Sequence, residues 1–214
     1  MKFLITGFDP FGGESVNPAW QAVQQLPKTI AGHSVCTLMI PTVFHKSIEV
    51  LMHGIAQHQP DAVLCVGQAG GRFDITLERI AINIDDARIC DNEGNQPIDI
   101  PIYKQGENAY FSNLPIKRIV SALKEQGIPA SVSNTAGTFV CNHLLYALLH
   151  HINKKLINVQ YGGFVHVPYI PEQVVNKPNT PSLEISRITK ALQCIIETMD
   201  ISVEDITVSG GKEF

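Results

Sequence analysis

The stretch "DAVLCVG", residues 61–67, decides the fold of this 214-residue chain. From Ala62 to Val66 every residue is apolar, with no polar residue in between. A short continuous apolar run of this kind is typical of a strand that is buried on both faces, as in the middle of a parallel sheet. The flanking sequence should then supply further strands, and helices to cover them.

Strand and helix patterns do alternate on both sides of this run. Expected strands cover residues 2–8, 35–40, 61–67, 130–134 and 162–168, and expected helices cover residues 17–26, 44–58, 115–127, 138–153 and 182–199. The first helix shows a strong start signal, with Asn17 as N-cap and Pro18 at the first helical position. Such alternation indicates βαβ units, and the length favours one core, so we predict a single α/β domain over residues 1–214 with a mostly parallel sheet.

Three segments fit this alternation less simply. "ITLERIAINI", residues 75–84, alternates with period two and predicts another strand. Residues 88–113 are rich in Asn, Asp, Gly, Pro and Gln without periodicity, and so long a loop is usually functional or part of an interface. Four prolines at 168, 171, 178 and 181 predict an extended loop before the last helix.

Composition narrows the class of partner. The formal charge is −4, the isoelectric point is near 6.0 and no Lys/Arg run occurs, which argues against nucleic acid or an anionic membrane as the main partner. The first residues show no signal-peptide pattern, and no segment has the roughly 18 apolar residues of a membrane span. The five cysteines contain no C-x-x-C pair, so we expect free thiols in a reducing cytoplasm.

Four loops follow expected strands and are candidates for a common site: "GFDPFGG", "GQAGGR", "NTAGTFVC" and "VHVPYIP". Ligands of open α/β sheets bind outside the carboxyl ends of the strands, so we predict that these loops converge on one cleft. Their glycines do not form nucleotide motifs, because neither the Gly-Lys-Ser/Thr of a P-loop nor a G-x-G-x-x-G is present. They are better interpreted as loops where a ligand lies against the backbone.

Cys141 is the first candidate for chemistry. With Thr138 as N-cap, Cys141 would occupy the first turn of a helix, where free N–H groups and the helix dipole favour a thiolate. The alternative is a core position, because Cys141, Leu145 and Leu148 share one helical face. Three other thiols, at positions 36, 65 and 194, stand in apolar segments, and Cys90 falls in the long loop with no helix behind it.

Glu78 is the second candidate. In the expected strand, period two places Glu78 on the same face as the isoleucines at 80, 82 and 84. A carboxylate on an apolar face needs a cation or a hydrogen-bond donor, or its pKa rises. The alternatives are a simple ion pair with Arg72 or Arg88, or a strand that ends early and leaves Glu78 in solvent.

His166 could provide that partner. It stands at the end of an expected strand, before Pro168, and would project at the carboxyl edge of the sheet. A cysteine, a histidine and a carboxylate together form a nucleophile, base and orienter set, although a lone histidine is more often structural. His143 lies about 200° around the helix from Cys141 and cannot easily reach its sulfur. No metal-ligand spacing occurs, so neither a metal nor another cofactor is expected.

Four motifs in order resemble the pyroglutamyl peptidase I family of cysteine peptidases, also called pyrrolidone-carboxylate peptidases. They are "TGFDPFGGESVNPAW", "VGQAGGRFDITLERIAINIDDARI", "SNTAGTFVCNHLLY" and "GGFVHVPYIPEQ". The resemblance implies a twisted α/β sheet with helices on both faces, related in shape to nucleoside phosphorylases, and a cytoplasmic homotetramer without a cofactor. One departure is Cys90, where the family pattern leads us to expect Pro.

The resemblance also implies roles for particular residues. Glu78, Cys141 and His166 match a Glu/Cys/His catalytic triad. The residues that match substrate-binding positions are Phe8, Phe11 and Phe139 as pocket walls, Gln68 through its backbone, and Arg88 near the oxyanion. The implied reaction is acyl transfer, in which the Cys141 thiolate attacks the carbonyl of an N-terminal pyroglutamyl residue.

Two other functions are compatible with these residues. A nucleoside phosphorylase-like transferase would use the glycine-rich loops for phosphate and would be insensitive to alkylation of Cys141. A non-catalytic protein on the same fold would bind small lactams and release no product. Hydrolysis of a pyroglutamyl amide separates both from the peptidase.

Overall fold

The computed structural model describes residues 1–199 and 204–211. Its strands are β1 (Lys2–Phe8), β2 (Thr29–Ile30), β3 (His33–Ile40), β4 (Ala62–Gln68), β5 (Ile75–Glu78), β6 (Ile80–Ile82), β7 (Ala109–Phe111), β8 (Ala130–Ser133) and β9 (Tyr161–Val167). Its helices are α1 (Pro18–Val23), α2 (Lys46–His58), α3 (Ile116–Glu125), α4 (Val140–Asn153), α5 (Pro171–Val174) and α6 (Ile185–Thr198). The single-domain prediction also covers residues 200–203 and 212–214, which lie outside the described residues.

Seven strands form one mixed sheet in the order β2-β3-β1-β4-β9-β5-β8. The neighbours β3, β1, β4 and β9 are parallel, whereas β5 runs antiparallel to β9 and β8 follows the direction of β5. The predicted mostly parallel α/β sheet is confirmed. In the described part of the chain, no helix is long and apolar enough to cross a membrane.

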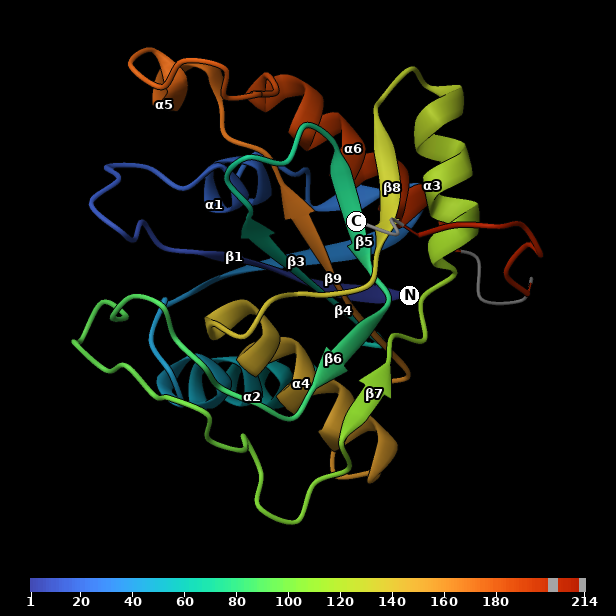
Figure 1. The fold of residues 1–214 in the computed structure, drawn as a ribbon. Coiled ribbons are helices and arrows are strands. Elements are labelled where there is room, and N and C mark those ends of the chain that lie inside the picture. The colour runs from blue at the N-terminus through green and yellow to red at the C-terminus, as the bar shows by residue number, and fades with distance from the viewer. Residues whose placement is uncertain (200–203, 212–214) are drawn as a thin grey trace.

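Strand β4 lies in the middle of the sheet and is buried along its whole length, as the opening stretch of sequence predicts. Helices α1, α3 and α6 cover one face, and α2 and α4 cover the other (Figure 1). Alternate residues of β4 therefore enter two separate cores: Leu64 and Val66 pack under the first group of helices, and Val63 and Cys65 under the second. The predicted arrangement of helices on both faces is confirmed.

The local signals at α1 act as expected. The Asn17 side chain accepts a hydrogen bond from the Ala19 N–H at 3.0 Å, and Pro18 is the first helical residue. The side-chain nitrogen of Asn17 also donates a hydrogen bond to the Asp9 carbonyl at 2.9 Å. This second bond fixes the loop that follows β1, which is one of the four candidate site loops.

The continuous strand predicted over residues 75–84 is wrong. The chain leaves the main sheet after Glu78, and residues 80–82 form β6, which pairs with β7 in a separate two-stranded sheet. The Arg79 N–H still donates to the carbonyl of Ser133 on β8, but the Arg79 carbonyl accepts from the N–H of Ser112, just after β7. The chain therefore turns from the main sheet to the second sheet at Arg79. The segment 88–113, predicted as a loop, contains β7, and the proline-rich loop contains the short helix α5.

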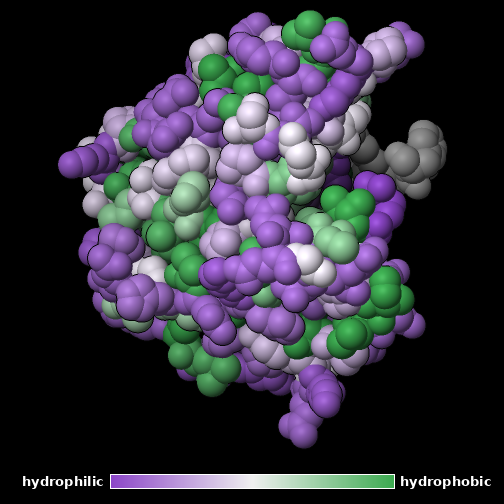
Figure 2. Space-filling view, turned by 90° about the vertical axis from the view of Figure 1, so that its left-hand side faces the viewer, coloured by the Kyte–Doolittle hydropathy of each residue, from purple (hydrophilic) through white to green (hydrophobic). Residues whose placement is uncertain are grey.

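Three of the four candidate loops lie at one edge of the sheet, because β1, β4 and β9 are parallel and their carboxyl ends coincide. For the fourth loop, "NTAGTFVC", the prediction is wrong. The strand before it, β8, runs the other way, so the carboxyl end of β8 is at the opposite edge of the sheet. Residues 134–139 then carry the chain back to the start of α4 (Figure 1). Figure 2 looks towards this edge, where separate apolar patches lie among hydrophilic residues.

Candidate active site

Cys141 is the second residue of α4. The predicted N-cap, Thr138, is wrong, because the helix begins at Val140 and Phe139 is the N-cap, with no side-chain cap hydrogen bond. The Thr138 hydroxyl instead donates to the carbonyl of Asp86 at 2.8 Å, and the Asp86 N–H donates to the Thr138 carbonyl at 3.0 Å. The start of α4 is therefore fixed by the segment around Asp86.

The sulfur of Cys141 lies directly above the backbone of β4. A Cβ atom added to Gly67 would stand 3.0 Å from Cys141 Sγ and 2.7 Å from the ring of Phe164. Only glycine leaves room for the sulfur at this point. Because Gly67 is the register partner of His166 on β9, the helix and the sheet bring Cys141 and His166 to the same place.

Glu78 and His166 are neighbours across the antiparallel pair β5 and β9. His166 lies opposite Thr76, and Glu78, two residues further along, points to the same face. His166 Nδ1 is 2.7 Å from Glu78 Oε1, a length typical of a charge-assisted hydrogen bond. Since a carboxylate can only accept, Nδ1 carries the proton in this pair, and Nε2 makes no hydrogen bond to Glu78.

Glu78 is fully buried and has a second partner that the sequence offered only as an alternative to His166. Arg72 Nη1 donates to the same oxygen, Oε1, at 2.6 Å. Burial raises the pKa of Glu78, but the hydrogen bond from His166 and the charges of His166 and Arg72 outweigh it and hold that pKa below its ordinary value. Glu78 is therefore a carboxylate at neutral pH.

The expectation of a resting Cys141 thiolate is not supported by its surroundings. Although residue 141 keeps some accessible surface, burial and then the charge of Glu78 raise the pKa of its thiol to about 12, against the opposing charge of Arg72. These effects exceed the favourable influence of the helix N-terminus. The raised pKa of the thiol favours its neutral form.

The other thiols differ from Cys141 in their surroundings. Burial raises the pKa of Cys65 to about 12 and also raises that of Cys194, and neither has a histidine–carboxylate pair beside it. Cys90 is exposed and contacts the Gln96 side chain at 3.5 Å. Cys36 is half-buried on β3. Of the five thiols, Cys141 alone stands beside the Glu78 and His166 pair.

Phenylalanine rings gather near the start of α4. The rings of Phe11 and Phe139 lie 6.2 Å apart, and Phe44, which the sequence did not single out, packs edge-on against Phe139 at 5.3 Å. Phe8 is 2% exposed and packs against Phe164 at 6.3 Å, so it supports the site from within the core. Phe11, Phe44 and Phe139 therefore form an aromatic cluster at the start of α4, the helix that carries Cys141.

The loops after β1, β4 and β9 are joined by a side chain that sequence reasoning missed, Gln173. Its amide nitrogen donates to Gln68 Oε1 at 2.9 Å and to Glu14 Oε2 at 3.3 Å, and its oxygen accepts from the Ile170 N–H at 3.2 Å. A glutamine in a loop gives no local sequence signal for such a role. Because Gln173 binds the Gln68 side chain, it fixes the position of Gln68, whose backbone is expected to contact substrate from the family resemblance.

Arg88 lies two residues after Asp86, whose backbone bonds Thr138 just before α4. It is exposed and makes no hydrogen bond or ion pair within residues 1–199 and 204–211. His143 is buried and structural, because its Nδ1 lies 2.7 Å from Asp85 Oδ2 and its Nε2 accepts from the His45 N–H at 2.9 Å. Among the described residues, no group of three His, Cys, Asp or Glu side chains is arranged to hold a metal ion.

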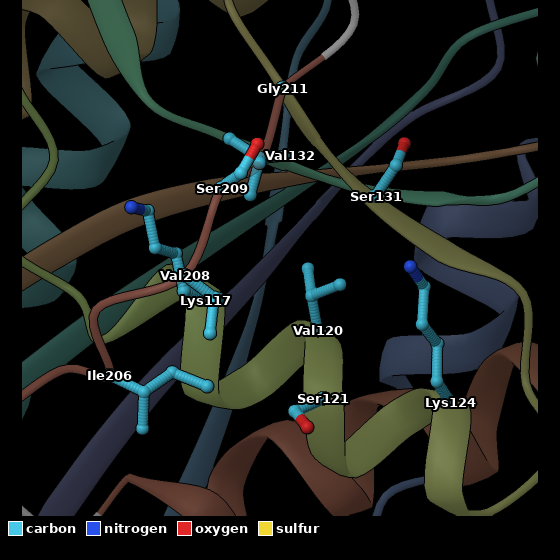
Figure 3. Close-up of a pocket in the computed structure, with 11 residues that line it drawn as sticks. Lys117, Val120, Ser121, Lys124, Ser131, Val132, Ile206, Val208, Ser209 and Gly211 are labelled. Carbon is cyan, nitrogen blue, oxygen red and sulfur yellow. The ribbon is translucent and has the colours of Figure 1, made fainter.

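A cavity of about 420 Å³ lies on the other face of the sheet, between α3 and residues 206–211 (Figure 3). Lys117, Val120 and Lys124 of α3 line it together with Val208 and Ser209 of the C-terminal segment, and the Lys124 side chain extends towards Ser131 (Figure 3). Neither Glu78, Cys141 nor His166 lines it. The reactive groups and this cavity therefore belong to different faces of the sheet.

Comparison with known proteins agrees with this geometry. The pyroglutamyl peptidase family model matches residues 1–201. The pyrrolidone-carboxylate peptidases of Clostridium perfringens (strain ATCC 13124) and Alkaliphilus oremlandii are 61% and 56% identical, each over 99% of both chains.

Solved structures agree as well. The crystal structure of pyroglutamyl peptidase I from Bacillus amyloliquefaciens superposes with a TM-score of 0.93 at 53% identity, over 97% of this chain and 99% of that one. A mutant pyrrolidone carboxyl peptidase of Pyrococcus furiosus gives a TM-score of 0.90 at 42% identity, over 94% and 99% of the two chains. The fold, the motifs and the full-length similarity agree, and the chain belongs to the pyroglutamyl peptidase family.

Proposed function

We propose that this chain is a cysteine peptidase that removes N-terminal pyroglutamyl residues from peptides, with Glu78, Cys141 and His166 as its catalytic triad. One observation carries the assignment of the triad: the 2.7 Å bond between Glu78 and His166, on the face where Cys141 lies over Gly67. The carboxylate holds the imidazole with Nε2 free for the thiol, which is the arrangement that nucleophilic catalysis by cysteine needs.

The reaction proceeds by acyl transfer. His166 Nε2 takes the proton of Cys141 as the sulfur attacks the pyroglutamyl carbonyl, and the unpaired N–H groups in the first turn of α4 stabilise the oxyanion. The imidazolium, held by Glu78, then gives its proton to the leaving amine and a thioester remains. Water, deprotonated by His166, hydrolyses the thioester and releases pyroglutamate.

The substrate pocket follows from the chemistry of the lactam. A pyroglutamyl ring is uncharged and its amine is already closed, so it needs apolar walls and a few amide contacts, and no carboxylate for an ammonium group. Phe11 and Phe139 supply the wall, Phe8 supports it, and the backbone of Gln68 supplies the amide contact. Arg88 acts near the oxyanion, since the two bonds between Asp86 and Thr138 bring its segment alongside the start of α4.

The chain acts as a homo-oligomer in the cytoplasm. Large apolar side chains are exposed in the region of the long loop and β7, with Ile98, Ile100 and Phe111 at 60%, 49% and 67% exposure, and these residues are suited to subunit contacts. Five unpaired cysteines suit a reducing compartment. Sedimentation velocity of the purified chain measures the assembly, and a monomer at micromolar concentration would exclude the tetramer.

Hydrolysis of a pyroglutamyl fluorogenic amide tests the function. Cys141→Ser should abolish turnover, because serine in place of the thiol is a poor nucleophile beside this histidine. Cys65→Ser and Cys90→Ser should each keep most of the turnover, since neither thiol takes part in the acyl transfer. Equal loss in the Cys141 and Cys65 variants, both folded by circular dichroism, would refute the assignment of the nucleophile.

A further inference from the structure

Arg72 connects three parts of the site. Its Nη1 donates to Thr76 Oγ1 at 2.5 Å and to Glu78 Oε1 at 2.6 Å, and its Nη2 donates to the Thr135 carbonyl at 3.1 Å. Its own backbone belongs to the loop after β4, and Thr135 belongs to the segment that leads to Cys141. One guanidinium therefore touches the strand of the carboxylate and the approach to the nucleophile.

The two donors to Glu78 use a single oxygen. Arg72 and His166 both bond Oε1, whereas the buried Oε2 has no hydrogen-bond partner in the described part of the chain. The Ser133 hydroxyl donates to the Thr135 carbonyl at 3.0 Å, and it also helps to lower the pKa of Glu78. Because rotation of the carboxylate would break both bonds, Arg72 fixes the oxygen that His166 needs.

The charge of Arg72 also matters for the sulfur. The titratable groups that face Cys141 are His166, Glu78, Arg72 and the buried thiol of Cys65. After burial, the carboxylate of Glu78 is the next cause that raises the pKa of the Cys141 thiol, and Arg72 lowers it. When Cys141 is a thiolate and His166 is an imidazolium, the two negative charges of the site, including that of Glu78, are balanced by two positive charges, including that of Arg72. Without Arg72 the site would carry a net negative charge.

We propose that Arg72 is a positioning residue of the triad, which holds the Glu78 carboxylate against His166 and balances its charge while Cys141 is a thiolate. This role rests on the proposed peptidase function. It differs from a purely structural ion pair, because a structural pair would affect folding and leave the reactivity of the sulfur unchanged.

The test compares wild type, Arg72→Met and Arg72→Lys by two measurements. The first is the rate of iodoacetamide modification of Cys141 between pH 5 and pH 9, followed by mass spectrometry of the peptide that contains it, so that the exposed Cys90 does not interfere. The second is kcat and KM for a pyroglutamyl fluorogenic amide. An opposite charge at this range changes a pKa by about one or more, so Arg72→Met should slow modification at pH 7 roughly tenfold and lower kcat by a similar factor, with little change in KM.

Arg72→Lys should lie within about threefold of wild type in the modification rate, because it keeps the charge. Arg79→Met is the matched control: Arg79 donates to the Gly210 carbonyl, away from the triad, and its loss should change neither measurement. Modification rates for Arg72→Met within twofold of wild type, or equal slowing in the Met and Lys variants, would overturn the proposal. If Arg72→Met does not fold, tenfold slowing in Arg72→Lys overturns it.

The two measurements also separate this role from the proposed function. Modification of Cys141 needs no substrate, so it reports on Arg72 even if the wild type fails to hydrolyse the pyroglutamyl amide. If wild type does not hydrolyse the amide but Arg72→Met still slows modification of Cys141, the proposed substrate is wrong and the role of Arg72 is supported.

Discussion

Glu78→Gln should lower kcat by roughly 100-fold while the chain stays folded. The substitution keeps the shape of the side chain and removes its charge from a fully buried position 2.7 Å from His166 Nδ1. When His166 becomes an imidazolium, the attraction between charges about 4 Å apart, at an effective dielectric constant of about 20, is about 4 kcal/mol. A neutral amide keeps about 1 kcal/mol of this as an ordinary hydrogen bond. The difference of about 3 kcal/mol corresponds to roughly 100-fold in rate.

Steady-state kinetics on a pyroglutamyl fluorogenic amide, with circular dichroism as a folding check, measures this effect. The loss should fall on kcat and leave KM nearly unchanged, because the charge acts on the transition state more than on bound substrate. Glu93→Gln is the matched control, since Glu93 is half-exposed and pairs with Lys46 away from the triad. A Glu78→Gln enzyme with more than a fifth of wild-type kcat would show that Glu78 only fills space in the core.

Two further predictions concern acid stability and the pocket. Because the pKa of Glu78 is lowered in the folded chain, its charge contributes stability above its unfolded pKa of about 4.5, and this contribution is lost as the pH falls below that value. The difference in urea midpoint between wild type and Glu78→Gln should therefore shrink from pH 6 to pH 3, and a constant difference would contradict the lowered pKa. Phe139→Ala should raise KM roughly tenfold through lost apolar contact with the lactam, whereas Phe111→Ala, at a 67% exposed position, should not; equal KM values for both would remove Phe139 from the pocket wall.

The order of the main strands and helices could be predicted because each of these has a strong local signal. The apolar run of β4 reports its burial on both faces directly, and Asn17 with Pro18 marks the start of α1 by a hydrogen bond made within four residues. Strand direction leaves no such local mark. The reversal of β5 and β8 depends on pairing between segments far apart in the chain, so the sequence could not place the end of β8 at the opposite edge.

The burial of Glu78 has a different cause from the one that the sequence suggests. The isoleucines at 80 and 82 lie in another sheet, and the carboxylate is buried by its position between β8 and β9. The sequence suggests Arg72 and His166 as alternative partners of Glu78, whereas in the structure both bond one oxygen of its carboxylate. The neutral state of Cys141 could not be predicted either, because the helix position is visible in sequence and the protein packed around the sulfur is not.

The close approach of Cys141 to Gly67 limits which positions can be varied to change the acyl group that the enzyme accepts. A side chain at position 67 would collide with the sulfur and with the Phe164 ring, so even alanine would displace the nucleophile. Directed-evolution libraries that seek new acyl groups should therefore keep this strand position invariant and place their diversity in the loops that follow β1 and β9. Changes in those loops would alter the shape of the entrance to the site, while the Cys141 sulfur keeps its position above Gly67.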